Sequence, residues 1–332
     1  MSRVLRIGTR DSQLAVWQAT LVQQLLGKQG YASELVYMKS EGDIDIVTPL
    51  YELGVQGVFT KTLDAALLNE RIDIAVHSMK DVPTQLAKGI RQAAVLERAS
   101  TKDILVYKNG EDLGKLGVVN GQWSIVNEET LIDNSQLTTH PFTIATGSVR
   151  RIAQWKNRFP NHSIDNLRGN VNTRLRKLEE SSWNGAIFAA AGLERINLRP
   201  TKSIDLDWML PAPAQGAIMI VCRDADTEAA EACHHFNHED TALCTKIERD
   251  FLRALLGGCS TPISGLATVK NGEVMFAGNM VSPDGKLKTE IEKRTDRSNA
   301  ESLGLAAAKE ILTRGGQQIV ELIRNKPPNE TN

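Results

Sequence analysis

The sequence predicts a three-domain protein, with two doubly wound α/β lobes followed by a C-terminal α+β domain. Three observations support this prediction. The chain has 332 residues, which is more than one ordinary domain contains. In its first two thirds, short β-rich runs alternate with amphipathic helical stretches, a pattern typical of parallel sheets covered by helices on both faces. In the remainder the order changes, and two helices precede three strands.

The first lobe is expected to begin with a strand over 4–9, followed by a helix that Ser12 caps at its N-terminus. This helix should end near Gly27. The apolar residues on its expected buried face are Leu14, Trp17, Leu21 and Leu25. The other elements predicted for this lobe are strands at 34–38, 72–76 and 92–96 and a helix at 61–69.

The second lobe continues the pattern, and the last domain departs from it. Within the second lobe, 109–141 is polar and weakly patterned, and we interpret it as an excursion from that lobe. The tail 326–332 is expected to be disordered. The predicted strands are 103–107, 142–145, 186–190, 265–269, 273–281 and 287–293, and the predicted helices are 172–180, 227–236, 241–256 and those starting near 148 and 299.

Composition excludes several classes of protein. No run approaches the roughly 18–20 apolar residues that span a bilayer, and the N-terminus lacks the apolar stretch of a secretory signal. We therefore expect a cytoplasmic protein with no membrane partner. The cysteines form no C-x-x-C pair, which favours free thiols over a disulfide framework or a zinc site. They are Cys222, Cys233, Cys244 and Cys259.

The net charge of −1 conceals a basic window between Thr146 and Leu178. In this window the only acid is Asp165. Such a concentration of cations in a nearly neutral protein favours an anion site, although some of them are expected to be solvated charges on helix faces. Arg150 and Arg151 differ, because they directly follow an apolar run. The cations are Arg150, Arg151, Lys156, Arg158, Arg168, Arg174, Arg176 and Lys177.

Four segments share one composition, in which an apolar strand leads into hydroxyl and cationic residues. Hydroxyls and backbone N–H groups at a helix N-terminus bind anions, and arginine grips carboxylates in bidentate fashion. One such segment could be a simple helix cap, but several favour a ligand with many carboxylates or phosphates. The chain has no glycine-rich P-loop, which disfavours a nucleotide. The segments are 7–12, 76–83, 145–151 and 167–174.

These segments, in this order along nearly the whole chain, resemble the signature stretches of the porphobilinogen deaminase (hydroxymethylbilane synthase) family. The most specific are H-S-M-K-D-V-P-T at 77–84 and R-G-N-V-N-T-R-L-R-K-L at 168–178. The others are A-A-A-G-L-E-R at 189–195 (from Ala189), Q-G-A at 215–217, E-R at 248–249 and L-G-G-C at 256–259.

The resemblance implies an activity and a fold. The family condenses four porphobilinogen molecules head to tail, releases ammonia, and hydrolyses the product as hydroxymethylbilane, which passes to uroporphyrinogen-III synthase in tetrapyrrole (haem) synthesis. The fold would resemble type-2 solute-binding proteins, with hinges near 99–102 and 210–216, and the family suggests a monomer. The implied domains are 1–101 with 215–236, then 102–214 including an insertion at about 109–141, and 239–325.

The resemblance also implies a covalent cofactor, a dipyrromethane held by a thioether to Cys259. A thiolate is a soft nucleophile that can capture an electrophilic methylene carbon. Gly257 and Gly258 would allow a planar ring to approach the backbone closely. Asp81 matches the catalytic carboxylate, which would stabilise positive charge as ammonia departs. The alternative for Asp81 is a cap or an ion pair with Lys80.

The same resemblance assigns the binding residues, any of which could instead be structural. Porphobilinogen carries an acetate and a propionate group, which explains the need for many cations. The residues implied for the cofactor, besides Cys259, are Lys80, Asp81, Thr146, Ser148, Arg150, Arg151, Arg174, Gly192 and Gln215. Those implied for the substrate are Arg10, Ser12, Arg168, Arg174 and Arg195.

Two other functions remain open on the residues alone. A non-catalytic, two-lobed anion-binding module would use the arginines but give Cys259 no role. A nucleic-acid binder would use the basic window, but the near-zero net charge and the absence of a known motif disfavour it. No metal site is expected, because we interpret His234, His235 and His238 as surface histidines.

The chain departs from the family pattern at several positions. Gln13 replaces a usual proline, Ala214 a common glycine, and Gln56 a customary lysine in a loop over the active site. The run Ala-Thr-Gly-Ser at 145–148 replaces Gly-Thr-Ser-Ser, and 109–141 is longer than expected. None of these changes removes the proposed cysteine, aspartate or arginines.

Overall fold

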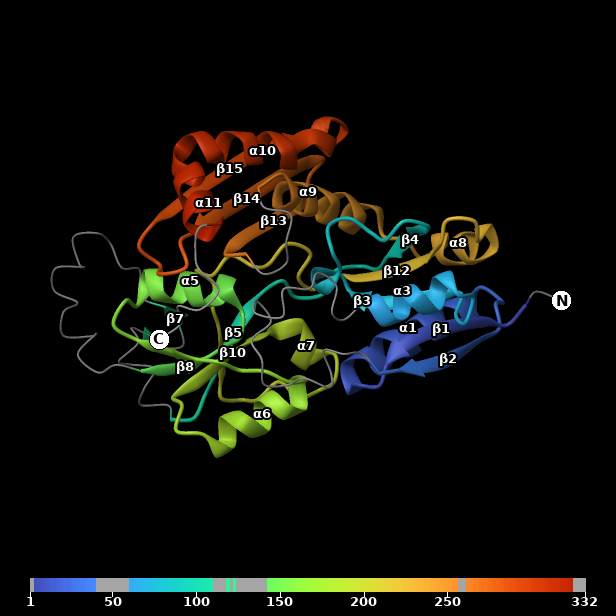
Figure 1. The fold of residues 1–332 in the computed structure, drawn as a ribbon, viewed down its shortest axis with the longest axis horizontal. Helices are drawn as coiled ribbons and strands as arrows, with labels where there is room; N and C mark the ends of the chain where they lie inside the picture. The colour runs from blue at the N-terminus through green and yellow to red at the C-terminus, as the bar shows by residue number, and fades with distance from the viewer. Residues whose placement is uncertain are drawn as a thin grey trace.

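The computed structural model describes residues 3–39, 60–109, 118–119, 122–123, 142–255 and 261–324. These residues form two α/β lobes side by side and a third domain that lies against both (Figure 1). The first lobe is at the N-terminal, blue end of the view, the second is green, and the third is orange to red. Among the described residues, no helix is both long and apolar enough to cross a membrane.

Lobe 1 is a five-stranded sheet in the order β2-β1-β3-β12-β4. Alternate residues of β12 point to opposite faces, so that Ile220 packs with helices α1 and α8 while Val221 packs with helix α3. Both faces are therefore covered, as expected for a doubly wound lobe. The elements are β1 (Leu5–Arg10), α1 (Gln13–Lys28), β2 (Ser33–Met38), α3 (Lys61–Leu68), β3 (Ile74–Ser78), β4 (Ile90–Val95), β12 (Ile218–Arg223) and α8 (Thr227–His234).

Lobe 2 repeats this arrangement in the order β11-β5-β10-β8-β9. Trp155 of α5 packs on one face of the sheet, and Leu178 of α6 packs on the other together with α7. The elements are β5 (Asp103–Tyr107), β8 (Thr143–Ala145), α5 (Val149–Arg158), β9 (Ser163–Asp165), α6 (Val171–Glu180), β10 (Gly185–Ala189), α7 (Ala190–Glu194) and β11 (Ser203–Asp205). A further pair, β6 (Val118–Val119) with β7 (Gln122–Trp123), lies within the predicted excursion.

Each sheet contains one antiparallel strand, which corrects the expectation of purely parallel sheets. Strand β12 runs antiparallel to both β3 and β4, and β5 runs antiparallel to both β10 and β11. Each of these is the first strand after the chain crosses from one lobe to the other. The domain boundaries given above stay predictions, and this strand membership supports them.

The third domain is a three-stranded antiparallel meander covered by helices. Its core centres on Phe251 and Phe276, whose rings meet edge to face at 4.9 Å. Gly304 lets α10 approach α9 closely, because a Cβ there would lie 2.1 Å from the carbonyl oxygen of Ile247. The elements are α9 (Glu239–Leu255), β13 (Ile263–Lys270), β14 (Glu273–Val281), β15 (Lys288–Asp296), η3 (Arg297–Ser302), α10 (Leu303–Ile311), η4 (Leu312–Gly316) and α11 (Gln317–Arg324).

The two crossovers between the lobes run side by side. The backbone N–H of Ala99 donates to the carbonyl of Gly216 at 3.1 Å. Gly216 has φ +86°, and a Cβ there would lie 2.6 Å from the carbonyl oxygen of Ser100, so this position requires glycine. Ala214 also has positive φ, at 61°. These segments coincide with the predicted hinges.

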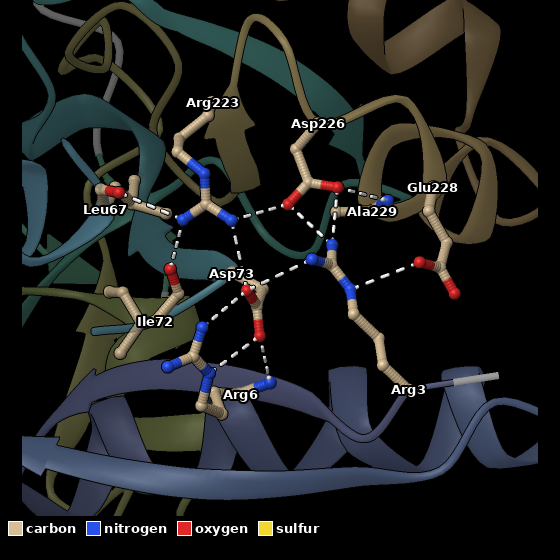
Figure 2. Close-up of polar contacts among 9 residues, drawn as sticks. All are labelled: Arg3, Arg6, Leu67, Ile72, Asp73, Arg223, Asp226, Glu228 and Ala229. Atoms are coloured by element: carbon tan, nitrogen blue, oxygen red, sulfur yellow. Dashed lines mark hydrogen bonds and ion pairs between the residues drawn. The ribbon is translucent and has the colours of Figure 1, made fainter. Parts of the chain in front are cut away.

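An ion-pair network joins the N-terminal strand of lobe 1 to β12 and α8 (Figure 2). Asp73, which is 1% exposed, accepts from the backbone N, Nε and Nη2 of Arg6 at 2.9, 3.0 and 2.9 Å. Arg223 bridges Asp73 and Asp226 at 3.1 and 2.7 Å, and Arg3 also donates to Asp226. The network ties strands that are far apart in sequence.

The buried face of α1 differs from the prediction. Its buried residues are Gln18, Ala19, Val22 and Leu26, whereas Trp17 is 37% exposed. The polar Gln18 is tolerated inside because its Nε2 donates to the Ser78 hydroxyl at 2.9 Å. The apolar periodicity therefore predicted a buried face of α1 that is offset by about one residue from the observed buried face.

Candidate active site

The predicted site residues follow the carboxyl ends of parallel strands in both lobes. Arg10 ends β1, the short helix η1 (Met79–Asp81) follows β3, and Thr146 follows β8. Loops at this edge of an α/β sheet are the usual ligand-binding region. The charges of Asp81 and Arg10 in lobe 1 act on Arg174 in lobe 2, so the two halves face one another.

Lys80 and Asp81 lie on a short loop that the third domain holds in place. Arg249 of α9 donates to the carbonyls of Val82 at 2.9 Å and Pro83 at 2.6 Å. Asp81 is exposed, and Nζ of Lys80 lies 3.4 Å from Oε1 of Gln215. Sequence reasoning found Arg249 only as part of a family motif, because an arginine on a helix gives no other signal of such a role.

Asp103, at the start of β5, is a fully buried carboxylate that the sequence analysis did not identify. It accepts from Nη2 of Arg150 at 2.7 Å, from Nε and Nη2 of Arg151 at 3.0 and 2.7 Å, and from Nε2 of Gln215 at 3.0 Å. Burial alone would raise the pKa of Asp103, but Arg150, Arg151 and Lys80 hold this pKa at about 2. The only signal in the sequence is a single acid directly before an apolar strand.

Arg150 and Arg151 are therefore parts of an internal network. They are 4% and 5% exposed, and they also donate to the carbonyls of Leu210 and Ile187 at 2.8 and 2.9 Å. The prediction that they contact cofactor carboxylates directly stays untested. In this arrangement Asp103 and the carbonyls are their partners.

The remaining cations are crowded together. Burial, followed by the charge of Arg151, lowers the pKa of Lys80 to about 8. The same two causes lower the pKa of Arg174 to about 10, with Arg168 and Arg10 adding to the effect. Burial lowers the pKa of Arg195 to about 10. A lowered pKa means that the positive form is destabilised, and an anionic ligand would relieve this.

Other predicted residues have structural partners. The hydroxyl of Ser12 caps α1, accepting from the N–H of Ala15 at 3.4 Å. Oγ1 of the buried Thr146 accepts from the N–H of Ser148 at 3.3 Å. Nη2 of Arg195 donates to the carbonyl of Gly216 at 2.7 Å. These bonds orient the segments, and a direct role in binding stays a prediction.

Two further predicted residues, Gly192 and Gln215, lie where the lobes and their crossovers meet. A third predicted residue, Arg168, is buried. A Cβ at Gly192 would lie 3.6 Å from Leu14 of lobe 1, which is an ordinary contact. Gln215 also donates through Nε2 to the carbonyl of Thr101 at 2.7 Å, joining the two crossovers. Arg168 is 3% exposed.

Cys259, its two preceding glycines, Gln56 and the tail 326–332 lie outside the described residues. The other cysteines are buried. Burial raises the pKa of Cys233 to about 12 and that of Cys244 to about 11, which makes them poor nucleophiles. Nδ1 of His238 accepts from the N–H of Thr241 at 3.2 Å and so caps α9.

Together, the fold and the site define a two-lobed α/β protein whose facing strand ends carry cations, suited to a ligand with several carboxylates. Residues 5–231 match the family model "Porphobilinogen deaminase, dipyromethane cofactor binding domain", and residues 242–313 match "Porphobilinogen deaminase, C-terminal domain". A curated porphobilinogen deaminase of Chlorobium phaeobacteroides (strain BS1) is 37% identical, covering 98% of this chain and 99% of that protein. The chain belongs to the porphobilinogen deaminase family and carries its dipyrromethane cofactor-binding domain.

Solved structures of other proteins resemble parts of the chain more distantly. An ancestral cationic amino acid solute-binding protein (AncCDT-1) has a TM-score of 0.41 at 14% identity, covering 70% of this chain and 87% of that one. The VFT2 domain of BvgS from Bordetella pertussis has a TM-score of 0.38 at 14% identity, covering 70% and 85%. The fold assignment rests on the strand orders described above.

Proposed function

We propose that this protein condenses four porphobilinogen molecules head to tail on a dipyrromethane primer attached to Cys259. Ammonia leaves at each addition, and hydrolysis releases hydroxymethylbilane for uroporphyrinogen-III synthase. The reaction is a transferase step of tetrapyrrole synthesis, carried out by a cytoplasmic monomer. Membership of the family and the cofactor-binding domain support this proposal.

The observation that carries the proposal is the match to both family models, over residues 5–231 and 242–313. The site agrees with it, because burial and neighbouring positive charges lower the pKa of Lys80 and of Arg174, which lie on opposite lobes. Crowded, partly desolvated cations gain most from a ligand that brings several negative charges. Each pyrrole unit bears an acetate and a propionate group. The residues present therefore fit both primer and substrate, and Arg10, Arg168 and Arg195 would add further positive charges to the set.

The chain's own residues would act as follows. The primer, when bound, supplies the pyrrole carbon to which the next unit is joined. Asp81 lies exposed on the η1 loop, where its carboxylate can stabilise the positive charge left on porphobilinogen when ammonia departs. Arg249 fixes this loop through two carbonyls, so that the carboxylate keeps its position during successive additions.

Intact-mass measurement of the protein purified from cells tests the proposal. The native protein should exceed its sequence mass by one dipyrromethane and give a colour with Ehrlich's reagent. Cys259→Ser should show neither, and Cys244→Ala, which alters a buried thiol, should show both. A native protein that makes hydroxymethylbilane while unmodified at residue 259 would contradict the mechanism. A protein that is unmodified and inactive would instead be an anion-binding module.

A further inference from the structure

An aromatic ring of lobe 1 lies against an arginine of lobe 2. Trp17 belongs to helix α1, and Cζ of Arg195 lies over its ring, 5.8 Å from the ring centre. The attraction between a guanidinium group and an aromatic face extends to about 6 Å. Arg195 directly follows helix α7, so this is a contact between the two lobes.

The side of α1 that carries Trp17 faces lobe 2 at two further positions. Oε1 of Gln13 accepts from Nδ2 of Asn172 at 3.0 Å. A Cβ at Gly192 would lie 3.6 Å from the side chain of Leu14. Residues three and four apart lie on the same side of a helix, and Gln13 and Leu14 have this spacing from Trp17. This side of α1 is therefore turned toward lobe 2, which explains why an aromatic residue occurs outside the buried face of the helix.

Arg195 is half-buried and carries N–H groups that the described part of the chain does not use. Its Nη2 donates to the carbonyl of Gly216 at 2.7 Å. The charge of Glu194 acts on it, but Oε1 of Glu194 accepts from Arg199 at 2.7 Å. Within the described ranges, Nε and Nη1 of Arg195 have no acceptor, and neither is among the fully buried polar atoms. Both atoms can therefore be reached by an anionic ligand, which would also offset the burial of this cation.

We propose that Trp17 is a positioning residue for a ligand carboxylate, which it orders through Arg195. The ring covers one face of the guanidinium group and the carbonyl of Gly216 holds Nη2, so the other N–H groups keep a fixed direction in which they can donate to a carboxylate. A donor that is already ordered binds more tightly, because less conformational freedom is lost on binding. The inference deepens the proposed function and rests on it for the ligand, which is an acetate or propionate group of porphobilinogen or of the growing chain.

The two residues of this contact belong to different lobes, which links ligand binding to the arrangement of the lobes. Arg195 is ordered by Trp17 only while the lobes keep the observed arrangement. A carboxylate that binds the ordered arginine more tightly must stabilise this arrangement by the same factor. Each porphobilinogen that engages Arg195 therefore favours the arrangement in which the site is assembled.

Steady-state kinetics of Trp17 variants of the full-length protein test the proposal. Trp17→Leu should raise KM for porphobilinogen about two- to fivefold, the factor expected for one exposed cation–π contact. It should leave kcat within about twofold, because the change acts on binding and not on Asp81. Trp17→Phe keeps an aromatic face and should raise KM by less than about twofold. Gln24→Ala, at an exposed position further along α1, is the control and should leave both constants unchanged.

Two further measurements show whether Trp17 acts through Arg195. In the Arg195→Gln background, Trp17→Leu should have no additional effect on KM, because the ring then has no cation to order. Hydrogen exchange over residues 190–197 should become faster in Trp17→Leu than in the wild type, because α7 and Arg195 lose a contact with lobe 1.

An unchanged KM in Trp17→Leu, or the same rise in KM with and without Arg195, would overturn the proposal. Unchanged exchange over residues 190–197 would overturn it whether or not the protein turns over porphobilinogen. A wild type that does not consume porphobilinogen would instead contradict the proposed function, and the exchange measurement would still decide whether Trp17 orders Arg195.

Discussion

Asp103 shows how a single buried carboxylate can organise a cationic site. It bonds to Arg150 and Arg151 of α5 and to Gln215 of the second crossover. Without this charge, adjacent buried guanidinium groups would repel one another and Lys80. Asp103 thus fixes residues that surround the proposed ligand without itself being exposed to it.

We predict that Asp103→Asn lowers the free energy of unfolding by about 3–5 kcal/mol, because it leaves buried arginines without a counterion. If enough protein folds, KM for porphobilinogen should change along with kcat, since the loop of Lys80 and the N-terminus of α5 both shift. Urea unfolding and steady-state kinetics measure the two effects. Asp205→Asn, which alters solvent-accessible ion pairs with Lys102 and Arg199, is the control and should change stability by less than about 1 kcal/mol.

Asp73 gives a prediction for pH dependence. Burial would raise its pKa, but hydrogen bonds from Arg6 and Arg223 and the charge of Arg3 lower it from 3.8 to about 2 (Figure 2). The folded pKa is below the unfolded one, so the contribution is full above the unfolded value and is lost as pH falls from about 4 toward 2. This contribution should be about 2 kcal/mol near neutral pH.

Urea unfolding as a function of pH checks this. The wild type should lose stability steeply over that acidic interval, and Asp73→Asn should be less stable at neutral pH with a flatter acid limb. Glu228→Gln removes an exposed acid from the same network and should behave like the wild type. A parallel acid limb in Asp73→Asn would show that other carboxylates cause the loss.

At this scale the sequence predicted the residue types of the site better than their partners. Lys80, Asp81 and Arg174 lie in segments where a strand end leads into charged residues, a pattern that is recognisable locally, and the family resemblance supplied their roles. Asp103 was not found, and Glu248 was found only as part of a family motif, because their partners lie 47 and 150 positions away in the chain. A contact of that range leaves no local pattern.

Among the elements, the N-terminus of α1 forms contacts across the cleft. Oε1 of Gln13 accepts from Nδ2 of Asn172 of α6 at 3.0 Å, and the Arg195 guanidinium lies 5.8 Å from the centre of the Trp17 ring. These contacts join the lobes at a point away from the crossovers. They stabilise the observed arrangement of the two lobes by a small free energy, which any movement of the lobes apart must overcome.

We predict that Gln13→Pro speeds product release about two- to fivefold, corresponding to the loss of one exposed hydrogen bond. Proline is well tolerated at the first position of a helix, so α1 should remain intact. Single-turnover measurement of hydroxymethylbilane release tests this, with Gln24→Ala on the exposed side of α1 as control. Release at the wild-type rate would show that this contact does not limit opening.

The predicted elements agree closely with those observed, but their pairing was harder to foresee. The strands over 103–107 and 273–281 match β5 and β14. Periodicity identified them because each buries apolar residues on a regular pattern. The antiparallel direction of β5 was missed, since direction depends on where the chain arrives from and not on the strand's own residues. Strand β12 (Ile218–Arg223) was not predicted as a strand at all.

Over the whole molecule, Glu248 connects the three domains. Fully buried, it accepts from Arg98 at 2.6 and 3.0 Å before the first crossover, from the N–H of Ala214 at 2.6 Å in the second, and from the N–H of Ala267 in β13 at 2.7 Å. The third domain is thereby fixed to the crossovers themselves. Any change in the angle between the lobes must be compatible with this joint.

We predict that Glu248→Gln costs about 3–5 kcal/mol of stability, because Arg98 keeps a buried charge that is no longer neutralised. Hydrogen exchange should become faster at the amide of Ala214 or of Ala267, because these amides use different oxygens of Glu248 and glutamine keeps only one of the two as an acceptor. Glu239→Gln, an exposed acid at the start of the same helix, is the control. Unchanged exchange at both amides would mean that the domain is held by its other contacts.

The position of β12 between β3 and β4 determines the order in which the two lobes can complete their sheets during translation. Lobe 1 begins at the N-terminus, yet β4 cannot join its sheet until Ile218–Arg223 has been synthesised. Every strand of lobe 2, from Asp103 to Asp205, is translated before then. During synthesis, therefore, the lobe that starts second is the one completed first, and the N-terminal strands must wait, partly paired, for the chain to return.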